Sequence, residues 1–375
     1  MTQLAYILAG EPSGDKIAAA LMRACKGTTE FHGIGGPLMK AEGLGGDRDY
    51  TALQIMGLAE ALHNYRALKQ LMQQLVDEAC ALRPDVIYTI DAKAFSLRFA
   101  KALRARMKQE GWQAKLVHVV APTIWAYGAG RRHAFENSFD ALLCLFPMEM
   151  GLFDKDKLTT KFIGHPAAYQ MAYPEREMPR ENKRLLLLPG SRASEITSLL
   201  PIFLRTISKI QGDRALCVSL VTIERQRALA EKLVAASGVD IAVITGQDAL
   251  NQAFQTHDLM LAASGTVTLE AALAGMPGLV AYKLNPLVAG LMRMRFKQKD
   301  PVLPNIILQK EIYPFFFQSQ VNEQTLSAQI ATMLDDGDLL AKMTANAREL
   351  KECLTNSAPS FEDAIASALN KINKA

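Results

Sequence analysis

Short apolar runs alternate along the chain with longer segments in which apolar residues recur every three or four positions. Each run ends at a glycine, a proline or a small polar residue, and a helical pattern follows. This rhythm predicts βαβ units and parallel sheets. The predicted strands are Leu4–Ala9, Glu30–Ile34, Val86–Ile90, Leu116–Val120 and Ala141–Leu145, and then Arg184–Leu188, Leu216–Val221, Ile241–Ile244, Leu259–Ala262 and Leu279–Tyr282.

The rhythm occurs twice, and a charged stretch that contains Pro174 and Pro179 separates the two occurrences. Prolines and charges without an apolar period indicate a linker. We expect an N-terminal domain over 1–165, a linker over 166–183, a C-terminal domain over 184–345, and C-terminal helices over 346–375 that can pack back on the first domain. Ser357 or Ser360 is expected to cap the last helix.

Composition narrows the class of protein. The chain has 375 residues, 49% of them apolar, and a formal net charge of +4, which is too small to indicate nucleic-acid binding. The five cysteines are scattered and form no Cys-x-x-Cys pair, so neither disulfides nor a zinc site is expected, and a reducing cytoplasm fits better. No run approaches the roughly 18 apolar residues of a membrane span, so any membrane contact is expected to be peripheral.

The second half carries two turns suited to phosphate, each directly after a predicted strand. Backbone N–H groups at a helix start and a forked arginine cation both bind phosphate oxygens. A carboxylate one helical turn further on can accept hydrogen bonds from ribose hydroxyls. The hydroxyl residues could instead be ordinary helix caps, and the arginine part of a surface ion pair. The residues are Gly190, Ser191 and Arg192 in the first turn, and Ser264, Gly265, Thr266 and Glu270 in the second.

Asp91 is the best catalytic candidate in the first half. It directly follows the strand Val86–Ile90, where a partly desolvated carboxylate can take a proton from a sugar hydroxyl. It could instead cap the helix that follows. The loop from Gly10 to Asp15 and the glycines around Gly35 also follow strands, and their alternative role is turn formation and capping.

Two segments mix apolar and basic residues in a way that suits an acyl chain or an anionic membrane surface. They are 55–62, which includes Met56, and 287–299, which includes Arg293 and Arg295. Core packing is the alternative for both. Two Asp-x-Asp triplets, beginning at Asp47 and Asp154, lie in charged turns rather than at strand ends, so no metal and no cofactor is expected.

Together these motifs resemble the lipid-A-disaccharide synthase family, and their order and spacing cover most of the chain. The landmarks are Ala9-Gly10-Glu11-Pro12-Ser13-Gly14-Asp15, Gly35-Gly36-Pro37-Leu38-Met39, Met56-Gly57, Ile90-Asp91-Ala92, Trp125-Ala126, Gly164-His165-Pro166, Leu188-Pro189-Gly190-Ser191-Arg192, Ala263-Ser264-Gly265-Thr266 and Leu303-Pro304-Asn305-Ile306.

The resemblance implies an α/β protein of the GT-B fold, with two Rossmann-like domains whose parallel sheets face a central cleft. It implies an inverting, metal-independent glycosyltransferase. Its substrates would be UDP-2,3-diacylglucosamine and 2,3-diacylglucosamine 1-phosphate (lipid X), and its products the β-1,6 disaccharide 1-phosphate and UDP. The expected location is the cytoplasmic face of the inner membrane of a Gram-negative bacterium, and a homodimer is a possible assembly.

The resemblance also implies residue roles. Asp91 matches the general base, Arg192 would stabilise the departing diphosphate, and Glu11 and Asn305 match polar positions near the reaction. The UDP would be held by Gly190, Ser191, Arg192, Ser264, Gly265, Thr266 and Glu270. The acceptor and its lipid would meet Gly10, Ser13, Met56, Arg293 and Arg295.

The chain departs from the family pattern at two places. Lys93-Ala94 stands where Pro-Asp is usual, so a second carboxylate is missing beside Asp91, and Ala121-Pro122-Thr123 stands where Ser-Pro-Ser is common. Two other functions stay open. One is a different GT-B enzyme, such as another lipid-linked sugar transferase or a UDP-sugar epimerase, and the other is a non-catalytic protein that binds lipid or nucleotide.

Overall fold

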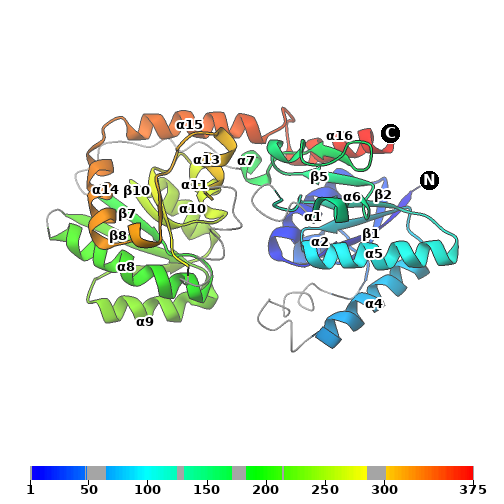
Figure 1. Ribbon diagram of the computed structural model, residues 1–375, viewed down its shortest axis with the longest axis horizontal. Coiled ribbons are helices and arrows are strands. Elements are labelled where there is room, and N and C mark those ends of the chain that lie inside the picture. Colours follow the sequence, from blue (N-terminus) through cyan, green and yellow to red (C-terminus); the bar gives the residue numbers. More distant parts are fainter. Residues whose placement is uncertain are drawn as a thin grey trace. The chain divides into compact units, whose positions relative to one another are not determined.

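The computed structural model describes residues 2–46, 48, 65–124, 131–170, 183–212, 215–284 and 301–374. It divides into two compact units, Met1–Tyr169 with Leu354–Ala375, and Gln170–Cys353. Each unit contains a six-stranded, all-parallel sheet with helices packed against it (Figure 1). The prediction of an α/β protein with two parallel sheets is therefore confirmed.

The first unit is built on the strand order β2-β1-β3-β4-β5-β6. Since β1 lies between β2 and β3, the order reverses beside β1, which makes a topological switch point between β1 and β3. The strands are β1 (Gln3–Ala9), β2 (Thr29–Ile34), β3 (Val86–Ile90), β4 (Lys115–Val119), β5 (Ala141–Cys144) and β6 (Thr159–Phe162). The helices are α1 (Pro12–Ala24), α2 (Pro37–Ala41), α4 (Tyr65–Leu82), α5 (Lys93–Glu110), α6 (Arg131–Glu136), α7 (Pro166–Gln170) and α16 (Phe361–Asn373), with a 3-10 turn η1 (Pro147–Glu149).

The second unit repeats the scheme with the order β12-β11-β10-β7-β8-β9, which reverses beside β7 and places its switch point between β7 and β10. Its strands are β7 (Lys183–Leu188), β8 (Leu216–Thr222), β9 (Ala242–Thr245), β10 (Leu259–Ala263), β11 (Gly278–Tyr282) and β12 (Phe315–Phe317). Its helices are α8 (Ala193–Gln211), α9 (Arg227–Ser237), α10 (Gln247–Thr256), α11 (Val267–Leu273), α13 (Leu303–Leu308), α14 (Glu323–Asp335) and α15 (Leu339–Leu354), with 3-10 turns η2 (Glu224–Gln226) and η3 (Gln318–Gln320).

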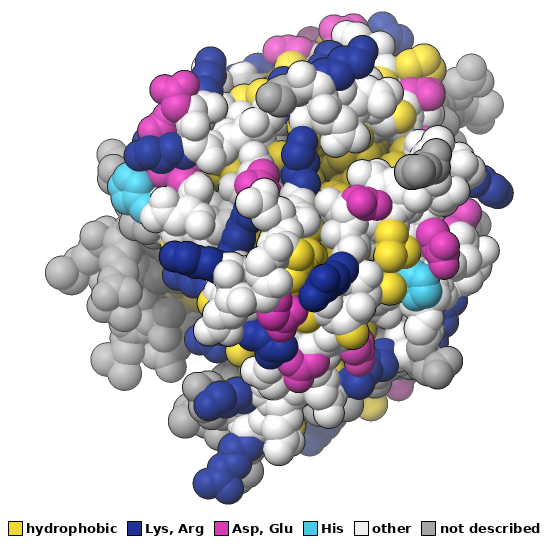
Figure 2. All heavy atoms as spheres, turned by 90° about the vertical axis from the view of Figure 1, so that its right-hand side faces the viewer, with side chains coloured by type: hydrophobic (Ala, Val, Ile, Leu, Met, Phe, Trp, Pro, Cys, Tyr) yellow, Lys and Arg dark blue, Asp and Glu magenta, His cyan; other side chains and the backbone are white. Residues whose placement is uncertain are grey.

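One face of the molecule shows a mixture of charges. On the face of the first unit seen in Figure 2, Lys and Arg side chains are interspersed with Asp and Glu side chains, which agrees with the small net charge of the chain. Among the described residues, no helix is long and apolar enough to cross a membrane.

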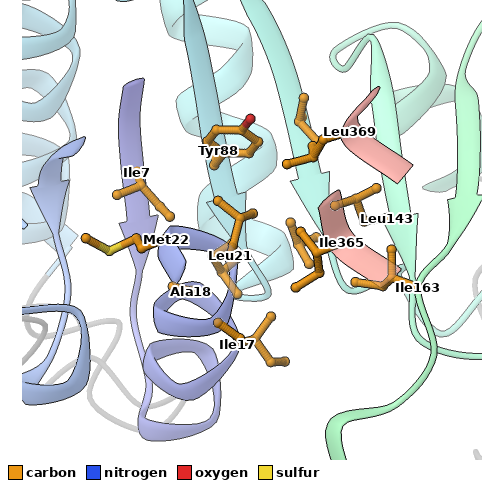
Figure 3. Packing of buried hydrophobic residues seen from close by; sticks show 14 of the residues in the cluster. Ile7, Ile17, Ala18, Leu21, Met22, Tyr88, Leu143, Ile163, Ile365 and Leu369 are labelled. Atoms are coloured by element: carbon orange, nitrogen blue, oxygen red, sulfur yellow. The ribbon is translucent and has the colours of Figure 1, made fainter. Parts of the chain in front are cut away.

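Both faces of the central strands β1 and β3 are buried, which is why these strands are mainly apolar runs. Tyr6 and Leu8 of β1 point to the side covered by α4 and α5, whereas Ala5, Ile7 and Ala9 point to the side covered by α1 and α16. Figure 3 shows the second of these layers, in which Ile7 of β1, Leu21 of α1 and Ile365 of α16 belong to one apolar cluster.

The C-terminal helix α16 is thus part of the core of the first unit, although about 185 residues separate it from the rest of that unit. Ser360 is its N-cap and accepts a hydrogen bond from the N–H of Asp363 at 3.1 Å, so the capping predicted for Ser360 is confirmed. The domain boundary predicted at 345/346 falls within α15, and the second unit extends to Cys353.

All ten predicted strands are present, with ends that differ by at most one residue from the prediction. The pattern missed β6 and β12, each of which is one of the two edge strands of its sheet. β6 reads Thr-Thr-Lys-Phe and β12 has three residues. An edge strand has one neighbour and is short or polar, so neither gives the long apolar run by which a central strand is recognised.

We expect Ile365→Ala to destabilise the first unit by about 2–5 kcal/mol, because it removes a fully buried side chain from a packed core. Both tryptophans of the chain, Trp112 and Trp125, fall in the residue range of this unit, so tryptophan fluorescence during urea unfolding measures it. The control is Asn370→Ala, an exposed position on α16. Equal urea midpoints for both variants would show that α16 does not stabilise this unit.

Candidate functional site

The loops after β1 and β3 leave the first sheet side by side at its switch point. Ala9 of β1 is in register with Ile90 of β3, so Gly10 and Asp91 are the first residues beyond neighbouring strand ends. The N–H of Asp91 donates to the carbonyl of Val119 at 2.9 Å. Ligands of open α/β sheets bind at such places, and the structure brings the two predicted first-half loops together there.

Asp91 is not a helix cap. The N-cap of α5 is Ala92, without a side-chain hydrogen bond, and both Asp91 (φ 48°) and Ala92 (φ 42°) have left-handed backbone conformations. The hydroxyl of Ser96 donates to the Asp91 carbonyl at 2.8 Å and helps to fix this turn. Left-handed non-glycine residues cost free energy and are concentrated at functional sites, so the capping alternative for Asp91 loses its support.

A lysine lies near Asp91, and its charge also acts on a buried carboxyl group. Lys93 Nζ is 3.4 Å from Asp91 Oδ1. Glu149, in the 3-10 turn after β5, is 2% exposed, and its Oε2 accepts hydrogen bonds from the N–H groups of Leu145 and Phe146, both at 3.1 Å. Burial raises the pKa of Glu149 to about 7, although these two N–H groups and the Lys93 charge favour its ionised form.

Sequence reasoning missed Lys93 and Glu149 as parts of this site. A charged residue inside an apolar run just after a strand, as Glu149 is, could have signalled it. His118 of β4 was missed too. Burial first and the Lys93 charge second lower its pKa to about 3, so it is neutral, and its Nδ1 lies 2.7 Å from the Thr89 hydroxyl.

The glycine loop after β1 combines exposed and structural residues. Gly10 is buried, Glu11 occupies the N-cap position of α1, and the side chains of Glu11 and Ser13 are on the surface. Asp15 is buried, and its carboxylate accepts hydrogen bonds from the N–H groups of Gly36, Leu38 and Met39 at 2.8–3.1 Å. The turn and capping role therefore accounts for Asp15, whereas the Glu11 side chain lies at the surface.

The phosphate-directed turn after β7 is held by a carboxylate from its own helix. Glu195 Oε2 accepts hydrogen bonds from the N–H groups of Ser191 (3.1 Å) and Arg192 (3.3 Å), and Glu195 Oε1 pairs with Arg192 Nη1 at 3.1 Å. Gly190 has a φ of 112°, and a Cβ there would lie 2.5 Å from Glu195 Oε2. The Arg192 side chain is 72% exposed, so the turn is shaped internally while its guanidinium stays accessible.

The turn after β10 faces the same switch point, because Leu188 of β7 is in register with Ala262 of β10. The hydroxyl of Ser264 donates to the Pro301 carbonyl at 3.4 Å, and Gly265 and Thr266 are exposed. Thr266 is the N-cap of α11 but makes no side-chain cap hydrogen bond.

Glu270 accepts a hydrogen bond from a neighbouring helix. The Gln247 amide, at the start of α10, donates to Glu270 Oε2 at 3.4 Å. Gln247 is exposed and was not predicted from the sequence. These two side chains put a donor and an acceptor beside the turn after β10, which is the chemistry that ribose and base edges require.

Asn305 is a structural residue in this fold. It is 6% exposed, its Nδ2 donates to the Tyr313 carbonyl, and its Oδ1 accepts from the N–H groups of Ile312 and Tyr313. These bonds tie α13 to the segment that leads into β12. A catalytic role for Asn305 stays a prediction without support from these contacts.

Three predicted lipid-side residues, Met56, Arg293 and Arg295, lie outside the described residues, as do Asp47 and Asp49. Asp154 is described. Its carboxylate accepts from the N–H of Asp156 and lies 3.5 Å from Lys157 Nζ. Within the described part of the chain, no three His, Cys, Asp or Glu residues are grouped as a metal site would need.

Comparison with known proteins decides the family. The model of the lipid-A-disaccharide synthetase family matches residues 5–369. A lipid-A-disaccharide synthase of Paramagnetospirillum magneticum is 34% identical over 94% of this chain and 93% of its own, and one of Neisseria meningitidis is 34% identical over 92% of each chain.

This chain belongs to the lipid-A-disaccharide synthase family. It is accordingly a glycosyltransferase of lipid A biosynthesis, and the resemblance stated from the motifs is confirmed. Solved structures show the fold. A UDP-GlcNAc 2-epimerase from Neisseria meningitidis bound to UDP-GlcNAc matches all of both chains with a TM-score of 0.59 and 12% identity, and Acinetobacter baumannii MurG does so with 0.56 and 14%.

The raised pKa of Glu149 predicts that the stability of the fold depends on pH. Its pKa is about 7 in the folded protein against 4.5 for an ordinary glutamate. The protonated form therefore stabilises the fold fully below pH 4.5, and this contribution is lost as the pH rises through 7. Glu149→Gln keeps a neutral acceptor for Leu145 and Phe146 at every pH.

We expect the stability of Glu149→Gln relative to the wild type to rise by about 2–3 kcal/mol between pH 5 and pH 8. Urea unfolding followed by tryptophan fluorescence at the two pH values measures this change. A difference between the two proteins that stays the same at pH 5 and pH 8 would show that Glu149 ionises normally.

Proposed function

We propose that the protein joins UDP-2,3-diacylglucosamine to lipid X, forming the β-1,6-linked disaccharide 1-phosphate and releasing UDP. The observation that carries the proposal is the position of Asp91. It follows a central strand at a switch point, in a strained turn, and is not used as a helix cap. Family membership supplies the class of reaction, and this geometry supports the residues proposed for it.

In the proposed reaction, the Asp91 carboxylate takes the proton of the acceptor 6-hydroxyl as its oxygen attacks C1 of the donor sugar. A bond forms between O6 and C1, the bond from C1 to the UDP oxygen breaks, and the configuration at C1 is inverted. The leaving UDP gains negative charge. Arg192, whose guanidinium is exposed above the turn after β7, is placed to stabilise that charge.

The donor nucleotide would bind to the second unit. Gly190 and Ser191 shape the turn after β7, and Ser264, Gly265 and Thr266 form the turn after β10 at the same switch point. Glu270 would accept hydrogen bonds from the ribose hydroxyls, and Gln247 adds a donor beside it. This grouping supports a UDP site, because each member lies beyond the carboxyl end of a strand.

The acceptor would bind to the first unit, at the loop with Gly10, Glu11 and Ser13, which leaves the sheet next to the loop that begins at Asp91. We propose that the lipid chains are met by Met56 and by the basic segment with Arg293 and Arg295, on the cytoplasmic face of the inner membrane. The sequence of that segment supports peripheral binding, since it mixes apolar residues with Lys and Arg. Assembly as a homodimer is a further part of the proposal.

The test of this function is incubation with UDP-2,3-diacylglucosamine and lipid X, followed by mass spectrometry of the products. We expect a disaccharide 1-phosphate and UDP in equal amounts. Release of UDP without a disaccharide would contradict the proposal, and so would conversion of the UDP-sugar alone, which is the outcome for an epimerase.

Asp91→Asn should lower turnover at least about a hundredfold, because an amide cannot accept the proton. Binding of UDP, measured by calorimetry, should not change, since the nucleotide is proposed to bind the other unit. The matched control is Asp77→Asn, an exposed aspartate of α4. Full activity in Asp91→Asn would exclude Asp91 as the base.

Arg192→Ala should weaken UDP binding about tenfold or more, the usual worth of a hydrogen bond to a charged group, and it should also slow turnover. The control is Arg205→Ala, an exposed arginine further along α8. If Arg192→Ala and Arg205→Ala bind UDP equally well, Arg192 does not contact the diphosphate.

A further inference from the structure

Lys93 contacts the carboxylate of Asp91, which is the proposed base. Lys93 is the first residue of α5, its side chain is 27% exposed, and its ammonium lies 3.4 Å from the Asp91 carboxylate, which is 32% exposed. Both groups therefore lie at the surface of the same turn, where a substrate can reach them. A lysine ammonium is a point charge on a flexible four-carbon stem, so it can change partner without moving the backbone.

The Lys93 ammonium lies 3.4 Å from Oδ1 of the carboxylate that has to receive the proton of the acceptor hydroxyl. The contact in the free protein thus competes with the approach of that hydroxyl. The other titratable groups near Lys93 do not draw it away from Asp91. Glu149 is buried with its Oε2 held by two N–H groups, and burial lowers the pKa of His118, which is neutral. An anion brought by the substrate would draw the ammonium away from Asp91.

We propose that Lys93 binds the phosphate group of the acceptor sugar, and that the contact between Lys93 and Asp91 opens when the acceptor is bound. The inference rests on the proposed function, in which Asp91 receives the proton of an acceptor that carries a 1-phosphate. A phosphate monoester bears about −1.5 to −2 charges near pH 7, against −1 for a carboxylate. The phosphate therefore competes well for the ammonium.

Two consequences follow for the reaction. The acceptor phosphate becomes a determinant of specificity, because a sugar without it leaves Lys93 on Asp91. Binding of the correct acceptor also frees the carboxylate that has to take the proton from that same acceptor. Lys93 is then a specificity-determining residue on the acceptor side, just as Arg192 is the proposed phosphate-binding cation on the donor side.

The experiment compares two acceptors and four proteins. The acceptors are short-chain 2,3-diacylglucosamine 1-phosphate and the same sugar without the phosphate. The proteins are wild type, Lys93→Met, Lys93→Arg and Lys101→Met, the last being an exposed lysine two turns further along α5. For each pair, kcat and KM for the acceptor are measured at a saturating concentration of the UDP-sugar.

We expect the wild type to prefer the phosphorylated acceptor, and Lys93→Met to lose about tenfold or more of that preference through a higher KM. Lys93→Arg should retain most of the preference, because a guanidinium also binds phosphate, and Lys101→Met should match the wild type. If Lys93→Met lowers kcat equally for both acceptors and keeps the preference, Lys93 acts on Asp91 alone and the proposal is wrong.

Measurements of acceptor binding test the role of Lys93 independently of the proposed reaction. Calorimetry with the two acceptors, in the absence of the UDP-sugar, needs no turnover. A loss of phosphate preference in Lys93→Met would support the inference even if the wild type formed no disaccharide. Equal affinities of wild type and Lys93→Met for the phosphorylated acceptor would overturn it, even if disaccharide were formed.

Discussion

The parallel pairing of β1 with β3 and of β7 with β10 is the constraint on which the rest of the structure depends. In the first unit it aligns Ala9 with Ile90, and in the second Leu188 with Ala262. Parallel strands end at one edge, and the reversal of strand order separates the crossover helices there. Each unit therefore exposes two neighbouring loops at one place, and the candidate base and the candidate phosphate-binding turns occupy those places.

Carboxylates that serve the backbone shape these loops. Asp15, Glu149 and Glu195 each accept hydrogen bonds from two or three N–H groups of a turn that follows a strand. Such bonds satisfy turn amides that would otherwise need water. The contact described for the Asp91 carboxylate is with the Lys93 ammonium and not with backbone N–H groups. Asp15, Glu149 and Glu195 thus stabilise the loops, whereas Asp91 is partly exposed and contacts a flexible lysine side chain.

The central strands could be predicted from the sequence because burial on both faces makes them continuous apolar runs, whereas the polar edge strand β6 and the three-residue β12 give no such signal. The positions of the loops after these strands could also be predicted, because each loop begins where an apolar run ends. What their side chains contact could not, since it depends on backbone angles and on residues distant in the chain. The left-handed turn at Asp91 and the bonds of Asn305 to Tyr313 are examples.

Both candidate phosphate-binding cations are held in weak, local ion pairs. Arg192 pairs with Glu195 three residues on, and Lys93 with Asp91 two residues back, and each pair is partly or largely exposed. Exposed pairs contribute about 0–1 kcal/mol to stability. A phosphate, with more charge than one carboxylate, can therefore take either cation at little cost to the fold. A strong buried pair would hold the cation in place, but a weak one keeps it oriented until an anionic substrate arrives.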